Sequence, residues 1–235
     1  FDNLTIKGYY PRSEPISFTS STLNNVTIDS DSYNKGIKFY SSIIKNSTIT
    51  MGCCSANFLF ENSTVYNTNI SEGDGSPVNG LYKIVKSKFI ESKINLPSAN
   101  VVAHQSIFKS PNLSENYISI GNTDSIYNSL FYGFSISKDI DALKISGRAG
   151  YNVGGNTKIK KNTFSNIRKA IIVEGKNTQE IEYNNLIAKL YSIENLIDSD
   201  LTIENNYWGT TTESEIQALI YDSSDNVDKG TVDYY

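Results

Sequence analysis

The stretch Ser42-Ile-Ile-Lys-Asn46-Ser-Thr-Ile49 decides the fold, because the chain repeats its pattern at a fixed interval. The stretch has a small polar start, two apolar residues, an Asn in the fifth place and another apolar residue in the eighth. It recurs 21 residues earlier as Ser21-Thr-Leu-Asn-Asn25-Val-Thr-Ile28 and 21 residues later as Ser63-Thr-Val-Tyr-Asn67-Thr-Asn-Ile70. A period near ~20 residues carried by short β-branched runs is typical of a β-solenoid. We therefore predict an all-β chain of stacked coils.

The repeat divides the rest of the chain. Coils are predicted to start at Ser21, Ser42, Ser63, Ser87, Ser106, Ser125 and near Lys158, with further repeats at Glu180 and Leu201. The longest departure from the period is a glycine-rich insert near 137–157, which is long enough for a lobe beside the stack. We expect a solenoid over 1–211 and a C-terminal segment over 212–235.

The Asn of each repeat suggests a structural role. Asn accepts left-handed backbone geometry better than other non-glycine residues, and stacked carboxamides hydrogen-bond in ladders. We expect one ladder through Asn25, Asn46 and Asn67 and a second run through Asn162, Asn184 and Asn205. The core is predicted to include the apolar residues of the repeats, namely Ile28, Ile44, Ile49, Val65, Ile70, Phe89, Ile94, Ile107, Ile126 and Ile203.

The segment after Trp208 reads as a cap. Thr212 and Glu215 have the spacing of a capping box, and Ile216, Leu219 and Ile220 fall on one helical face. We expect a helix over 212–221 that covers the last coil, followed by an edge strand within 231–235.

Composition narrows the partners. A formal net charge of −4 and a pI near 5.1 disfavour a general nucleic-acid binder, which usually carries a basic face. No apolar run approaches the ~20 residues that span a bilayer, so we expect no membrane span. Cys53 and Cys54 are adjacent, and the sequence leaves open whether they are free thiols or a vicinal disulfide.

The closing segment resembles a known group of proteins. The residues Asn205-Asn-Tyr-Trp-Gly-Thr210, the run at 216–220 and the ending Gly230-x-Val232-x-Tyr234 are similar to the end of bacterial right-handed parallel β-helix proteins of the pectate-lyase-like superfamily. The resemblance implies three parallel sheets, right-handed winding and an extracellular or cell-surface carbohydrate partner. We predict a right-handed parallel β-helix of about ten coils. The resemblance does not fix an activity, because the superfamily contains lyases, hydrolases, tailspikes and binding domains.

Candidate catalytic groups are few. Asp139 and Asp141 place two carboxylates on one strand face, and Glu180 and Glu182 form a second such pair. Glycan hydrolysis uses a pair of carboxylates, so Asp139 and Asp141 are the catalytic candidates. His104 is the single histidine and has no evident partner.

Acidic turns leave a structural calcium ion possible. Asp222, Asp225, Asp228 and the pair Asp29-x-Asp31 supply hard oxygen ligands without matching a known calcium loop. No other cofactor and no dedicated metal site are expected.

Tyrosines supply the binding signal. Tyr offers a flat apolar ring with a hydrogen-bonding tip, which suits the faces of sugars. We expect Tyr127, Tyr132, Arg148 and Tyr151 to contact a polysaccharide or cell-surface glycan around the insert. The function expected is therefore a non-catalytic extracellular module, more often a monomer than a trimer, that binds glycan or spaces domains at a surface. A polysaccharide lyase or glycoside hydrolase and a phage tailspike-type receptor-binding protein are the alternatives.

Overall fold

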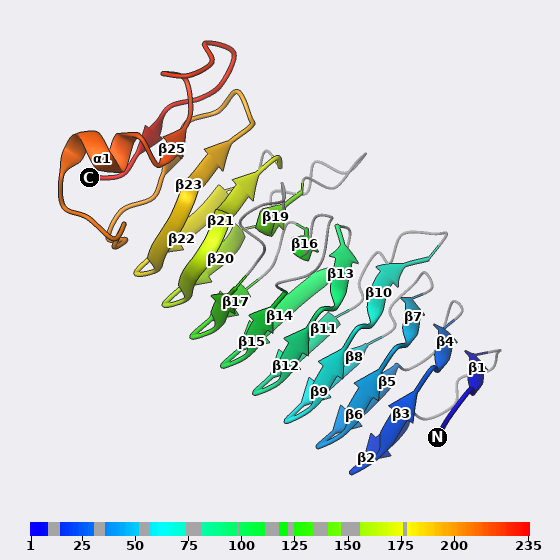
Figure 1. Cartoon of the computed structure of the whole chain (residues 1–235). Coiled ribbons are helices and arrows are strands. Elements are labelled where there is room, and N and C mark those ends of the chain that lie inside the picture. Colours follow the sequence, from blue (N-terminus) through cyan, green and yellow to red (C-terminus); the bar gives the residue numbers. More distant parts are fainter. Residues whose placement is uncertain are drawn as a thin grey trace.

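The chain is a parallel β-solenoid (Figure 1). The computed structural model describes residues 1–8, 15–30, 36–51, 57–73, 81–97, 99–110, 118–121, 125–133, 141–146, 156–175 and 178–235. Coils stack along one axis, with the N-terminus at one end and the only helix of the described residues at the other.

Each coil contributes a strand to a sheet of eight parallel strands, which we call the first face. Its inward residues are mostly apolar, with Thr157 and Gln179 as buried polar exceptions, and its outward residues are mostly polar, as alternation along a half-buried strand requires. The strands are β2 (Ile16–Thr19), β5 (Ile37–Tyr40), β8 (Phe58–Glu61), β11 (Leu81–Val85), β14 (Asn100–His104), β17 (Ser125–Tyr127), β20 (Asn156–Lys160) and β22 (Thr178–Glu182).

Two further runs of parallel strands complete the coil. The second face consists of β3 (Thr22–Asn24), β6 (Ile43–Lys45), β9 (Thr64–Tyr66), β12 (Lys88–Ile90), β15 (Ile107–Lys109) and β18 (Leu130–Tyr132). The third face consists of β1 (Thr5–Gly8), β4 (Thr27–Ser30), β7 (Thr48–Met51), β10 (Asn69–Glu72), β13 (Lys93–Leu96), β16 (Ile118–Ile120) and β19 (Asp141–Ile145).

The number of coils is smaller than the ten expected. Six coils, from β2–β3–β4 to β17–β18–β19, have three separate strands. In the next two coils, the second and third strands merge into β21 (Thr163–Val173) and β23 (Asn185–Asn195). β21 pairs with both β18 and β19 and so joins the second and third faces into one sheet. The right-handed sense of winding stays a prediction.

The core follows the predicted pattern with one exception. Nine of the ten predicted core residues are buried, and the exception is Ile107. Phe108 takes its place, because β15 pairs with β12 so that Phe108 stands beside the buried Phe89. An error of one residue on a strand moves a side chain to the opposite face.

Stacked phenylalanines run through this core. Phe18, Phe39 and Phe60 stack on the first face, with ring centroids 5.4 and 4.9 Å apart. Phe60 then meets Phe89 edge-on at 5.4 Å, and the stack continues on the second face through Phe108, Phe131 and Phe164. The aromatic stack therefore crosses from one face to the next in the middle of the solenoid.

A continuous ladder holds the corner between the first and second faces. The backbone amide of each corner residue donates to the side-chain oxygen of its equivalent one coil later, through Ser21, Ser42, Ser63, Ser87, Ser106, Ser129, Asn162, Asn184 and Asn206. Two predictions are corrected here. The sixth coil turns at Ser129, because Ser125 lies on β17, and Asn206 replaces Asn205, which instead takes the left-handed φ of 60°.

The corner between the second and third faces carries the predicted Asn residues. Asn25, Asn46 and Asn67 have φ of 54°, 50° and 45°, in the left-handed region that Asn tolerates. Asn67 donates to Asn46 at 2.9 Å, whereas Asn46 donates to Asn24 rather than to the expected Asn25. Glu91 takes the same backbone geometry, with φ of 49°.

The C-terminal end differs from the expected cap. The helix α1 (Glu213–Gln217) is short and buries none of its residues, and Thr212 makes no side-chain cap. Glu215 instead accepts a hydrogen bond from Thr210. Ile220 is buried on the short strand β25 (Ile220–Tyr221), while Ile216 is only half-buried.

The end of the core is covered largely outside the helix. Trp208 is buried and meets Tyr234 edge-on at 5.9 Å. β24 (Leu201–Thr202) pairs with β26 (Val232–Asp233), and both Leu201 and Val232 are buried. In the ranges that the structure describes, no helix has the length and apolar character needed to cross a bilayer.

Candidate functional site

The insert that was expected to hold the ligand contact falls largely outside the described residues. Asp139, Arg148 and Tyr151 lie outside the described residues, so the ligand contact at the insert stays a prediction. Cys53 and Cys54, which are not part of the insert, also lie outside the described residues. Asp141 begins β19 and is only 7% exposed, with its backbone beside that of Lys169 on β21. At that exposure Asp141 offers little surface to a polymeric substrate.

The corner ladder separates the two predicted tyrosines that are described. Tyr127 ends β17 on the first face, and Tyr132 ends β18 on the second. The Tyr127 ring lies 5.2 Å from the ring of His104 one coil earlier. Partial burial, together with the charge of Lys83, lowers the pKa of His104 below its ordinary 6.5, so the imidazole is neutral at pH 7.

Tyr132 belongs to a row on the outer surface of the second face. The strand register places Lys45, Tyr66, Ile90, Lys109 and Tyr132 next to one another on successive coils, and we call these five residues the Lys–Tyr row. The two tyrosines are 43% and 41% exposed. The Lys109 Nζ lies 5.7 Å from the centroid of the Tyr132 ring, within the range of a cation–π contact.

The row was missed by sequence reasoning, although the repeat contains the signal. Each of its members follows a corner serine by three places, as Lys45 follows Ser42 and Tyr66 follows Ser63. The misplaced start at Ser125 hid the fact that Tyr132 bears the same relation to Ser129.

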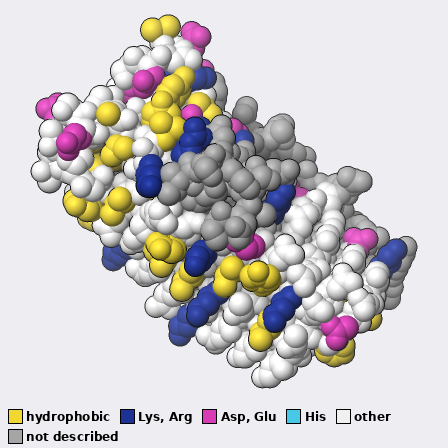
Figure 2. Space-filling model, in the orientation of Figure 1, with side chains coloured by type: hydrophobic (Ala, Val, Ile, Leu, Met, Phe, Trp, Pro, Cys, Tyr) yellow, Lys and Arg dark blue, Asp and Glu magenta, His cyan; other side chains and the backbone are white. Residues whose placement is uncertain are grey.

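The surface around the row is basic and apolar. The neighbouring outward row holds Ile43, Thr64, Lys88, Ile107 and Leu130. The outward residues of β3, β6, β9, β12, β15 and β18 include three lysines and no carboxylate. Figure 2 shows hydrophobic and basic side chains close together on the middle coils. This composition contrasts with the net negative charge of the whole chain.

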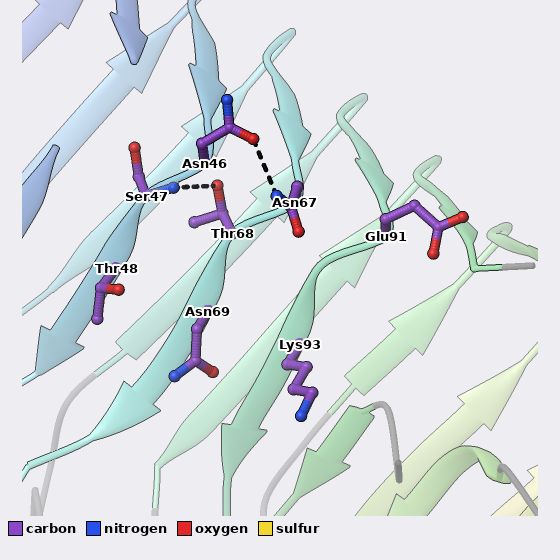
Figure 3. A pocket seen from close by; sticks show the side chains of 8 residues that line it. All are labelled: Asn46, Ser47, Thr48, Asn67, Thr68, Asn69, Glu91 and Lys93. Atoms are coloured by element: carbon purple, nitrogen blue, oxygen red, sulfur yellow. Dashed lines mark hydrogen bonds between the residues drawn. The ribbon is translucent and has the colours of Figure 1, made fainter. Parts of the chain in front are cut away.

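A polar groove borders the row at the corner between the second and third faces. It has a volume of about 380 Å³ and is lined by Asn46, Ser47, Thr48, Asn67, Thr68, Asn69, Glu91 and Lys93 (Figure 3). Asn46 and Asn67 directly follow Lys45 and Tyr66 in the chain. The groove therefore places amide and hydroxyl groups next to the coil that carries Tyr66.

Glu180, one of the carboxylate pair on the first face, is held in its ionised form. Lys160 forms ion pairs with both Glu180, at 2.5 Å, and Glu182. The hydrogen bond from Lys160, helped by one from Asn156, lowers the pKa of Glu180 to about 2. A glycoside hydrolase needs one carboxylic acid that keeps its proton, which a carboxyl group with this pKa does not supply at neutral pH.

The acidic turn near the C-terminus is organised by the chain itself. Asp222 Oδ1 accepts hydrogen bonds from the amide and hydroxyl of Ser224, and its Oδ2 accepts from the Val232 amide. Asp225 Oδ2 accepts from the Asp222 amide. Within the described ranges no three His, Cys, Asp or Glu side chains are grouped as a metal site would require.

We compared the chain with protein families, curated proteins and solved structures. No family model matches the chain, and no curated protein or solved structure is significantly similar to it.

Proposed function

We propose that this protein is a non-catalytic β-solenoid module of an extracellular or cell-surface protein, and that it binds glycan through the Lys–Tyr row. The observation that carries the proposal is the exposure of Tyr66 and Tyr132 in one row of a regular sheet. Large exposed apolar groups grouped on a surface are typical of interaction sites.

The chemistry of the row suits sugars. A tyrosine ring contributes flat apolar area for the C–H face of a pyranose, and its hydroxyl forms hydrogen bonds. The polar groove beside the row adds carboxamides and hydroxyls, which complement sugar hydroxyls.

The scaffold limits the entropy lost on binding. The backbone beneath the row is fixed by parallel pairing on both sides, from β6 to β18. Tyrosine has only two side-chain torsions to order, so little conformational entropy is lost when a ligand binds.

A glycan-array screen followed by substitution tests the proposal. We expect the Tyr66→Ala/Tyr132→Ala double variant to lose binding to any glycan that the unmodified chain retains. Tyr40→Ala is the matched control, because Tyr40 is an outward tyrosine on the first face. Unchanged binding by the double variant would refute a contact at the row, and so would an equal loss of binding in the double variant and in the control.

A further inference from the structure

The Lys–Tyr row contains the same pair twice. Lys45 stands beside Tyr66 on the next coil, and Lys109 stands beside Tyr132 on the next. Only Ile90 lies between the two pairs in the row. Each pair is thus three coils from its equivalent, a distance of roughly 14 Å at the ordinary spacing of parallel strands.

We propose that the ligand is a linear acidic polysaccharide that lies along the solenoid axis and contacts both pairs. This inference rests on the proposed function and adds to it the charge, the shape and the direction of the ligand. A repeated cation–aromatic pair on a periodic scaffold matches a polymer in which an anionic group and a sugar face recur.

Charge complementarity supports an anionic ligand. Lys45, Lys88 and Lys109 point outward from the second face, and none of the outward residues on its strands β3 to β18 is acidic. The exposed Lys86 and Lys161 extend the basic surface along the adjoining corner. In the described part of the chain Lys45 and Lys88 have no ion-pair partner, so their ammonium groups are available to carboxylate or sulfate groups.

The length of the surface supports a polymer. From Leu130, in the neighbouring outward row, the register continues along the second face through Thr163 and Asn185 to Tyr207, which is 49% exposed. Exposed tyrosines therefore stand on three coils of this face, two of them in the Lys–Tyr row and Tyr207 in the neighbouring outward row. A short oligosaccharide would reach one of these positions, whereas an extended chain would reach several.

A single-stranded nucleic acid is the competing polyanion, because its bases also stack on tyrosine. Sugar is favoured, since the chain as a whole carries a formal net charge of −4, which disfavours a densely charged nucleic acid. The polar groove beside the row offers mainly amides and hydroxyls, together with one carboxylate, Glu91, and one further cation, Lys93.

The test compares three polymers with one backbone, namely dextran, carboxymethyl-dextran and dextran sulfate, in affinity electrophoresis or biolayer interferometry. We expect binding to an acidic polymer and weaker binding to neutral dextran. The carboxymethyl and sulfate forms distinguish the anionic group. Binding should weaken as salt rises, because screening lengths fall from about 10 Å at 0.1 M to about 3 Å at 1 M salt.

Charge-matched variants locate the contact. Lys45→Gln/Lys88→Gln/Lys109→Gln should lower the affinity for the acidic polymer about tenfold, as the loss of three exposed ion pairs predicts. Lys7→Gln/Lys38→Gln/Lys83→Gln changes the net charge equally but lies on the other two faces. Alginate oligomers of increasing length should bind more tightly until they span both pairs.

Three results would overturn the inference: equal affinity for dextran and its acidic forms, equal loss in both triple variants, or tighter lysine-dependent binding to poly(dT). Retention of neutral glycans on the array alongside any of these would leave the proposed function intact. Failure to retain any glycan, neutral or acidic, would reject the proposed function itself.

Discussion

Tyr82 stacks on Phe58 inside the solenoid with ring centroids 5.6 Å apart, yet its hydroxyl has no hydrogen-bond partner in the described part of the chain. The side chain is buried. A buried hydroxyl without a partner loses its hydration and gains nothing in return.

We expect Tyr82→Phe to stabilise the protein by about 1 kcal/mol, because it removes the unsatisfied group and keeps the ring. Thermal and urea unfolding would measure the change. Tyr40→Phe, at an outward position of the first face, should leave the stability nearly unchanged. A destabilised Tyr82→Phe would indicate that the hydroxyl has a partner after all.

The same residue predicts a dependence on alkaline pH. Burial, reinforced by the negative charge of Glu72, raises the pKa of Tyr82 above its ordinary 10.0. The unfolded chain therefore ionises first, and stability that is complete below pH 10.0 is lost as the pH rises further. Urea unfolding at stepped pH should show a smaller loss in Tyr82→Phe. Parallel curves for the two proteins would contradict this cause.

The corner ladder predicts a large effect from one hydroxyl. Ser63 Oγ accepts a hydrogen bond from the buried backbone amide of Ser42 at 3.1 Å and donates one to the Glu61 carbonyl at 3.0 Å. Ser63→Ala would leave that amide without its acceptor, which costs about 1–3 kcal/mol. Ser17→Ala, at an exposed position, is the control and should change the unfolding midpoint little.

Asn46 allows backbone and side-chain effects to be separated. Its left-handed φ of 50° suits Asn or Gly, and its carboxamide bonds to both Asn24 and Asn67. Asn46→Gly should remove only the carboxamide bonds, whereas Asn46→Ala adds a backbone penalty of about 1 kcal/mol. Differential scanning calorimetry should therefore give a lower melting temperature for Asn46→Ala than for Asn46→Gly. The reverse order would mean that left-handed geometry is not required at this corner.

The C-terminal end predicts unequal effects for two isoleucines. Ile220 is buried on β25, while Ile216 on α1 is half-buried. Ile220→Ala should destabilise the protein by about 2–5 kcal/mol, and Ile216→Ala by clearly less. If chemical unfolding showed equal losses of stability for Ile216→Ala and Ile220→Ala, the helix would cover the core as much as β25 does.

Much of the fold was predictable because the stacking of coils imposes a local rule. The period of 21 residues placed Ser42, Ser63 and Asn67 correctly at their corners. The predicted positions were wrong where the alignment of a coil depended on the identity of one residue. Ser125 has the sequence context of a corner serine, but the corner of that coil is Ser129. Ile107 follows its corner serine directly, but the inward residue of that strand is Phe108.

The surface was less predictable than the core for a physical reason. Inward positions are apolar in most coils, so the sequence of a single coil is enough to identify them. The Lys–Tyr row becomes visible only when outward residues of five coils are aligned in the correct register. The C-terminal helix was overestimated because Leu219 and Ile220 extend its apolar periodicity, although Ile220 belongs to a strand.

The corner ladder also bears on how such a chain changes its length. Every amide in it donates toward the next coil, and sequence separations between partners range from 19 residues, at Ser87 and Ser106, to 33, at Ser129 and Asn162. Extra residues are thus accommodated between corners without breaking the ladder. Because an internal coil accepts from one neighbour and donates to the other, an in-frame duplication of a coil creates one new junction, which repeats the same kind of ladder hydrogen bond. Gene-level gain or loss of whole coils would lengthen or shorten the outer surface without requiring any new kind of contact.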